Sequence, residues 1–283
     1  MSRPYFQFKQ FTVWHDRSAM RVGTDGVLLG SWASVDGLGE GAQYAIADRL
    51  DASAGLSVSS ASLCPRLLDV GTGTGLIALM LAQRLACARV VGVEVDDASA
   101  FQAEENVRRS PFSGRVEVVH TDFRDYTDAL HFDLIVCNPP FFTETLQCPD
   151  PGRNRARHVD GLSWHTLLAH SAQLLRPAGR VALIVPARVA AEVEAAACQV
   201  GLILRRRTKV STRPGKPCRR VLLEWGWHQR AFTGTEDGQD ALEIRPHQPQ
   251  PQPPLDEELC LEDEDGRPSR GYVALTRAFY LKF

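Results

Sequence analysis

Short apolar runs alternate with longer amphipathic segments between residues 66 and 200 of this chain. The runs with strand character are Arg66–Val70, Arg89–Val95, Val116–Asp122, Phe132–Cys137 and Arg180–Pro186. Segments of helical length separate most of them. Strands that alternate with helices form a parallel sheet covered on both faces. Two further strands, Leu202–Thr212 and Arg219–Gln229, follow as a hairpin. We therefore predict an α/β, doubly wound, mostly parallel seven-stranded sheet with an antiparallel edge hairpin.

The pattern divides the 283 residues into four parts. Residues 1–33 form an aromatic segment, a strand or hairpin followed by a helix that Thr24 or Asp25 would cap. We expect this segment to cover the site, and the alternative is a strand packed on the flank. Residues 34–65 are a linker or insertion, and 66–230 are the core. Residues 231–283 form a proline-rich and acidic extension whose terminal apolar segment docks on the domain.

Composition places the chain among ordinary globular proteins. The hydrophobic fraction is 44% and the charged fraction 23%. No apolar run has membrane-spanning length and no signal-peptide pattern opens the chain, so we expect a cytoplasmic protein. The seven cysteines include no C-x-x-C pair, which favours free thiols and implies no metal site. We expect a monomer that binds no membrane.

Charge is unevenly distributed although the net charge is only −2. Residues 205–220 contain eight basic residues and no acidic one, whereas Asp256 to Asp265 contains seven acidic residues. A basic run of this kind indicates either contact with nucleic acid or a solvated arginine-rich face. The sequence leaves both interpretations open.

A glycine-rich loop follows the first core strand. Gly71, Gly73 and Gly75 have the spacing G-x-G-x-G, and no G-K-[ST] follows to hold a triphosphate. Asp69, just before the loop, would repel a pyrophosphate but would accept a hydrogen bond from an ammonium group. Glu94, nineteen residues past Gly75, has the spacing at which an acid binds a ribose diol. These features favour S-adenosyl-L-methionine over a dinucleotide, and the alternative is a tight turn of any α/β protein.

A second acidic residue, Asp122, ends the third core strand. A carboxylate there is placed to accept a hydrogen bond from an adenine amine of the cofactor. The alternative role is capping of the following loop.

The fourth core strand ends in an unusual polar and aromatic tip, Asn138-Pro139-Pro140-Phe141-Phe142. Proline has no backbone N–H to donate, so the chain must leave the sheet here. Asn138 therefore lies at the carboxyl end of the strand, where open α/β sheets bind their ligands. Cys137 is interpreted as a small buried strand residue rather than a nucleophile.

With these motifs the chain resembles the class I methyltransferases, and among them the bacterial tRNA (adenine-N6)-methyltransferases that modify the adenosine next to the anticodon of a valine tRNA. The matching phrases are Phe6–Phe11, His15-Asp16, Gly23–Gly30, Asp69–Met80, Gly92–Glu94, Ala103–Val107, Ser110–Phe112, Asp122–Arg124 and Asn138–Phe142. The resemblance implies a Rossmann-like fold and a tRNA substrate. The chain departs from the family pattern at residues 34–65, at Cys137 and in the acidic, proline-rich stretch.

The resemblance also implies roles for individual residues. The three loop glycines shape the pocket for the amino-acid end of S-adenosyl-L-methionine, with Asp69 nearby. Glu94 binds the ribose hydroxyls and Asp122 the adenine, while Thr24 and Asp25 belong to the element that covers the methionine moiety. Asn138 contacts both cofactor and substrate.

An adenine amine is a poor nucleophile because its lone pair is delocalised into the ring. The Asn138 side-chain oxygen and the Pro139 carbonyl can each accept one amine hydrogen, and Phe141 can stack on the flipped base. The alternatives are methylation of guanine N2 in rRNA, methylation of a release-factor glutamine, and a non-catalytic RNA-binding factor of the same fold. The presence of both Glu94 and Asn138 favours catalysis.

Overall fold

The computed structural model describes residues 3–18, 20–38, 64–139, 162–227 and 253–282. The predictions for the interior of the 34–65 insertion and for Phe141 fall outside the described residues. The same holds for most of the proline-rich part of the 231–283 extension.

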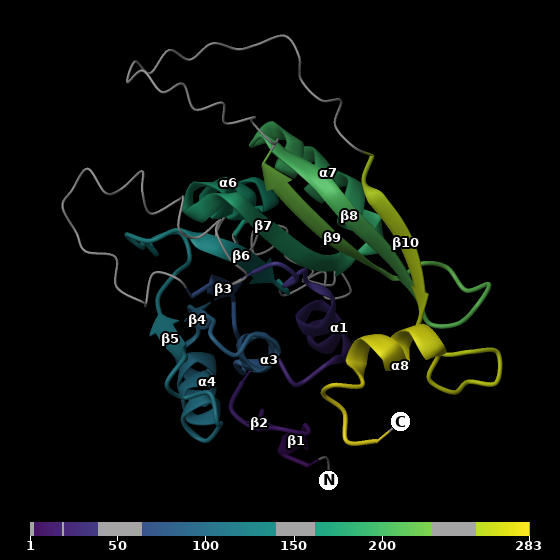
Figure 1. Ribbon diagram of the computed structural model, residues 1–283, viewed down its shortest axis with the longest axis horizontal. Helices are drawn as coiled ribbons and strands as arrows, with labels where there is room; N and C mark the ends of the chain where they lie inside the picture. The colour runs from purple at the N-terminus through teal and green to yellow at the C-terminus, as the bar shows by residue number, and fades with distance from the viewer. Residues whose placement is uncertain (1–2, 19, 39–63, 140–161, 228–252, 283) are drawn as a thin grey trace, which may run out of the picture.

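An eight-stranded mixed sheet forms the centre of the molecule, in the order β10-β8-β9-β7-β6-β3-β4-β5 (Figure 1). Its strands are β3 (Arg66–Val70), β4 (Arg89–Glu94), β5 (Val116–His120), β6 (Phe132–Cys137), β7 (Leu175–Pro186), β8 (Leu202–Ser211), β9 (Arg220–Trp227) and β10 (Leu255–Cys260). Only β9 runs antiparallel to its neighbours. The predicted fold class is confirmed. The eighth strand, β10, comes from the C-terminal extension, in which the sequence indicated no strand.

Helices cover both faces of this sheet. The longer ones are α1 (Thr24–Trp32), α3 (Leu76–Arg84), α4 (Asp97–Arg108), α6 (Trp164–Leu174) and α7 (Ala190–Gln199), with the short α8 (Arg270–Thr276) near the C-terminus. Figure 1 shows α6 and α7 on one side of the sheet and α1, α3 and α8 on the other. Each layer packs on its own cluster of buried apolar side chains. The alternating pattern of the sequence therefore produces a two-sided core.

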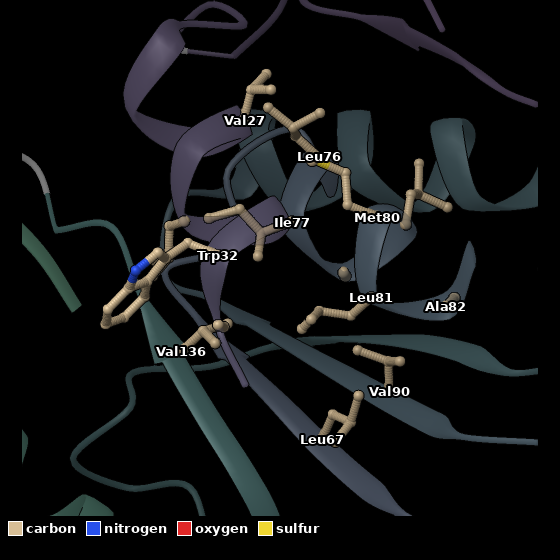
Figure 2. Packing of buried hydrophobic residues seen from close by; sticks show 14 of the residues in the cluster. Val27, Trp32, Leu67, Leu76, Ile77, Met80, Leu81, Ala82, Val90 and Val136 are labelled. Atoms are coloured by element: carbon tan, nitrogen blue, oxygen red, sulfur yellow. The ribbon is translucent and has the colours of Figure 1, made fainter. Parts of the chain in front are cut away.

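Helix α3 packs beside α1 on the same face of the sheet and is buried along most of its length. Its residues Leu76 to Ala82 are all buried. Figure 2 shows Leu76, Ile77 and Met80 beside Val27 and Trp32 of α1. The close approach depends on two glycines of α1: a Cβ at Gly26 would lie 3.0 Å from Leu76, and one at Gly30 would lie 2.8 Å from the Met80 sulfur. Larger residues at these positions would push α1 away from α3.

The acidic run of the C-terminal extension pairs with the basic run. Strand β10 lies parallel to β8, with Arg206 2.8 Å from Glu257 and Arg207 3.0 Å from Asp256. These side chains are partly exposed, and such pairs contribute about 0–1 kcal/mol each. The ion pairs therefore fix the register of β10 more than they stabilise it. Burial of Leu259 and Phe279 anchors the described part of the extension.

The N-terminal segment forms a separate two-stranded sheet, β1 (Tyr5–Gln7) and β2 (Thr12–Trp14), followed by α1. The predicted cap of α1 is wrong: Gly23 occupies the N-cap position, with no side-chain hydrogen bond. Thr24 and Asp25 are instead the first two helical residues. Asp25 lies 2.8 Å from Arg220, so its carboxylate holds a strand of the edge hairpin rather than the helix terminus.

Asn106 of α4 connects β2 to the glycine loop. Its side-chain oxygen accepts a hydrogen bond from the Trp14 N–H, and its amide donates to the carbonyl oxygens of Trp14 and Thr74. The residue is fully buried. Asn106 is therefore the polar link that places the N-terminal sheet against the core.

We expect Asn106→Ala to lower the free energy of unfolding by at least about 2 kcal/mol, because buried backbone groups of Trp14 and Thr74 would lose their partners. Urea denaturation measures this loss. Glu104→Ala, at an exposed position of the same helix, is the control and should change the midpoint little. Equal midpoints for the two variants would contradict the role of Asn106.

Candidate active site

The predicted site residues meet where the strand order reverses, between β3 and β6. Val70 of β3 is paired with Cys137 of β6 on one side and with Val93 of β4 on the other. Gly71, Asn138 and Glu94 are the next residues of these strands, so they lie side by side at one edge of the sheet, about 5 Å apart from strand to strand. This is the position at which doubly wound sheets bind ligands. The structure thus brings Gly71 and Glu94, which we predict to bind the cofactor, next to Asn138, which we predict to bind the substrate amine.

The glycine loop turns sharply out of β3. Gly71, Gly73 and Gly75 have φ angles of 67°, 57° and 78°, a region that favours glycine. The Gly71 N–H donates to the Val93 carbonyl oxygen at 2.8 Å, which bends the loop toward β4. A Cβ at Gly71 would meet nothing within 4 Å. Glycine is therefore required at this position by backbone conformation, and the space beside it is open.

Asp69 is buried beneath this loop. One carboxylate oxygen, Oδ2, accepts hydrogen bonds from the Thr72 hydroxyl at 2.6 Å and from the Ala78 N–H at 3.1 Å. The other, Oδ1, is buried and has no hydrogen-bond partner among the described residues. Burial raises the pKa of Asp69 to about 7, the two hydrogen bonds oppose this shift, and the charge of Glu94 adds to it. Asp69 thus holds the loop through Oδ2, while Oδ1 stays buried and without a partner among the described residues.

Glu94 at the end of β4 is held by backbone donors. Its Oε2 accepts from the Gly73 N–H at 2.8 Å, and its Oε1 accepts from the N–H groups of Val95 and Asp96 at 3.0 Å. A carboxylate has about four lone-pair positions. Three are used here, which fixes the side chain and leaves acceptor capacity on Oε2 for a hydroxyl donor.

Asp122 lies beyond the third core strand rather than within it, because β5 ends at His120. Its carboxylate accepts hydrogen bonds from both the backbone N–H and the guanidinium of Arg124. These bonds lower its pKa, with the Arg124 side chain as the largest cause. The loop-capping role that the sequence left open is therefore present in the structure. Contact with the cofactor adenine stays a prediction.

Asn138 carries the second unpartnered acceptor of the site. Its Oδ1 is buried and without a hydrogen-bond partner among the described residues, while its amide nitrogen lies 4.0 Å from the Met20 sulfur. A Cβ at Gly26 of α1 would lie 3.9 Å from the same nitrogen. Pro139 follows, partly buried. The start of α1 and the preceding turn thus lie against the Asn138 side chain. The covering role of residues 1–33 stays a prediction.

Two exposed apolar residues at this edge were missed by sequence reasoning. Val95, next to Glu94, is 62% exposed, and Met20, next to Asn138, is 43% exposed. An apolar residue directly after the acid that ends a strand was a usable signal for Val95. Met20 carried none, because its contact with Asn138 spans 118 residues of sequence.

Cys137 is not a nucleophile. The residue is buried, and burial together with the charges of Asp69 and Glu94 raises the pKa of its thiol well above the usual value. The thiol therefore stays protonated. The described residues include no group of three or more His, Cys, Asp or Glu side chains that could hold a metal ion, and none of the described helices is long and apolar enough to cross a membrane.

A polar cavity of about 190 Å³ lies between β2 and α4, lined by residues that include Trp14, Arg17 and Phe101. It contains none of the predicted site residues. This cavity is therefore separate from the site formed by Gly71, Glu94 and Asn138.

Comparison with known proteins agrees with this geometry. Residues 46–194 match the family described as "Methyltransferase small domain". The "tRNA1(Val) (adenine(37)-N6)-methyltransferase" of Bacteroides thetaiotaomicron is 42% identical over 282 residues, which cover 99% of each chain. The protein of the same description from Aeromonas hydrophila is 40% identical over 98% of this chain and 97% of its own.

Among solved structures, a predicted O-methyltransferase from Agrobacterium tumefaciens superposes with a TM-score of 0.58. The alignment covers 90% of this chain and 96% of that one, at 18% identity, so it supports the fold alone.

The doubly wound sheet with a glycine loop at its switch point defines a class I, S-adenosyl-L-methionine-dependent methyltransferase. Within that class, relatives match this chain at about 40% identity over its whole length. The chain belongs to the tRNA1(Val) (adenine(37)-N6)-methyltransferase family.

The raised pKa of Asp69 predicts a pH-dependent stability that Asp69→Asn removes. Between about pH 4 and pH 7 the folded protein keeps a proton on Asp69 that the unfolded chain releases, so this contribution is lost as pH rises through about 7. Relative to the Asn variant, the wild-type free energy of unfolding should fall by about 2–3 kcal/mol between pH 5 and pH 8. Urea denaturation of both proteins at several pH values measures this, and parallel curves would contradict it.

Proposed function

We propose that this chain transfers the methyl group of S-adenosyl-L-methionine to the N6 amine of adenosine 37 in a valine tRNA, the activity that its relatives' names describe. The observation that carries the proposal is the buried Oδ1 of Asn138 beside the glycine loop, which has no hydrogen-bond partner among the described residues. A polar atom that is buried without a partner is costly unless a ligand satisfies it. An amine hydrogen would do so.

The acceptor side holds the adenine amine by its hydrogens. Asn138 Oδ1 would accept one hydrogen and the Pro139 carbonyl the other, which favours the tetrahedral form of the nitrogen and directs its lone pair outward. Phe141, outside the described residues, would stack on the flipped base, a contact worth about 1–3 kcal/mol. The catalytic contribution of these residues is positioning and dipole orientation, because the displacement itself needs no general base.

The donor side fits S-adenosyl-L-methionine through the remaining free acceptors. Asp69 Oδ1 is available to its ammonium group, and Glu94 Oε2 to a ribose hydroxyl. The open space beside Gly71 admits a ligand close to the backbone of the glycine loop. When bound, the cofactor supplies a methyl group made electrophilic by its sulfonium. The adenine nitrogen bonds to the methyl carbon as the carbon–sulfur bond breaks, and the extra proton leaves to solvent.

The covering element and Asp122 complete the proposed site. We assign Thr24 and Asp25 to the element that closes over the methionine moiety, because α1 begins beside Asn138. We assign Asp122 to the cofactor adenine on its place after β5, the strand next to β4. Binding of adenine there requires the Asp122 carboxylate to share its acceptor capacity with Arg124. A tRNA substrate leads us to expect that the enzyme acts in the cytoplasm.

Asn138→Ala should lower the rate of methylation at least about a hundredfold, the usual order for loss of one oriented polar contact to the reacting group. Its affinity for S-adenosyl-L-methionine should remain within a few-fold of wild type, since Asp69 and Glu94 are untouched. Mass spectrometry of nucleosides from a methylated valine tRNA transcript gives the rate, and calorimetry gives the cofactor affinity.

A transcript with guanosine at position 37 is the matched control and should gain no methyl group. Normal turnover by the Asn138→Ala enzyme would refute the role of Asn138. Methylation of the control transcript at other positions would refute the choice of adenosine 37.

A further inference from the structure

The basic residues of the run 205–220 differ in their surroundings. Arg206, Arg207 and Arg213 face acidic side chains of the C-terminal extension, at 2.8 Å from Glu257, 3.0 Å from Asp256 and 2.6 Å from Glu262. Arg206 also lies over the Trp32 ring, 4.5 Å from its centroid. The charge of these three arginines is compensated within the chain, and acidic residues 262–265 adjoin Arg213.

The second group is exposed and uncompensated among the described residues. Lys216 and Arg219 lie in the loop between β8 and β9, and Arg188 lies in the short turn after β7. The Ala187 N–H donates to the Arg219 carbonyl oxygen at 3.1 Å, so the turn and the loop are joined. No acidic side chain of the described residues pairs with any of these three cations. They form one exposed basic surface, which we name the edge surface.

The edge surface lies at the same end of the sheet as Asn138. Strand β7 runs parallel to β6, so the turn after Pro186 and the tip after Cys137 face the same edge. Strand β9 begins at that edge, because Arg220 is paired with Pro186. Arg220 in turn lies 2.8 Å from Asp25, whose neighbour Gly26 approaches Asn138. A continuous row of neighbours therefore leads from the acceptor side chain to Arg219.

We propose that Arg188, Lys216 and Arg219 bind the phosphate backbone of the RNA whose base enters the site at Asn138, and that Arg206, Arg207 and Arg213 do not contact it. The inference rests on the proposed function, since it supplies the substrate class. The basic residues near this edge therefore have two roles: three arginines hold the C-terminal extension, and the edge surface binds RNA. RNA phosphates are the groups that three exposed cations without acidic partners among the described residues would bind at this edge.

Phosphate contacts have a signature that separates them from other effects. Each contact releases condensed counterions, so its loss makes the logarithm of affinity about 0.7–1 less steep in the logarithm of salt concentration. The loss does not depend on RNA sequence, because phosphates carry none. A residue that acts only on fold or chemistry changes neither property.

The test measures binding of an unmodified valine tRNA transcript to the full chain at several salt concentrations. Arg188→Ala, Lys216→Ala and Arg219→Ala should each weaken binding several-fold and make the salt slope about one unit less steep, and the triple variant by about two to three units. A transcript of a different tRNA should lose affinity by the same factors. In methylation assays KM should rise while kcat at saturating RNA stays near wild type.

Two variants serve as matched controls. Arg89→Ala removes an exposed arginine at the opposite edge of the sheet, at the start of β4, and Arg207→Gln removes a compensated arginine of the same run. Both should keep the wild-type slope. Unchanged slopes in the edge-surface variants, or equal changes in Arg89→Ala, would overturn the inference, as would a loss confined to kcat. If wild type binds the transcript but never methylates it, the proposed function fails while the slopes still decide the surface.

Discussion

The pairing of β3 with β4 on one side and β6 on the other is the constraint on which the site depends. Because Val70 is in register with both Val93 and Cys137, the residues that follow these strands emerge together. A shift of one residue in either pair would turn every buried side chain of that strand to the opposite face. The pairing of β3 with β4 and β6 therefore fixes the positions of Gly71, Glu94 and Asn138.

Around this register the molecule keeps polar atoms that do not favour folding. Within the described part of the chain, one carboxylate oxygen of the buried Asp69 and the side-chain oxygen of Asn138 have no hydrogen-bond partner. A buried polar atom without a partner costs about 1–3 kcal/mol. The large apolar clusters on both faces of the sheet offset that cost. Stability is thus reduced at the places where a ligand would restore the missing hydrogen bonds.

The chain ends also return to the site, although they are remote in sequence. The C-terminal extension supplies β10 to the sheet edge and places Phe279 where its carbonyl oxygen accepts from the Lys9 N–H. The N-terminal sheet is linked to the glycine loop by Asn106. Helix α1, which begins beside Asn138, also packs against α8 of the C-terminal extension. The N-terminal sheet and the described residues of the C-terminal extension thus pack together.

The sequence by itself determined the fold class. It also determined that the glycine loop, Asp69, Glu94 and Asn138 lie at or near the carboxyl ends of core strands, because strand periodicity and glycine spacing are local properties of the chain. Several features required the tertiary structure. The acidic residues of β10 and the basic residues of β8 look like two solvated runs until the strands pair, since an ion pair such as Arg206–Glu257, 51 residues apart, leaves no local pattern. The same holds for Asp25, whose partner Arg220 is 195 residues away, and for the split of the arginine run. Packing decides the strand register and the contacts between side chains that are distant in sequence, and packing depends on several segments at once.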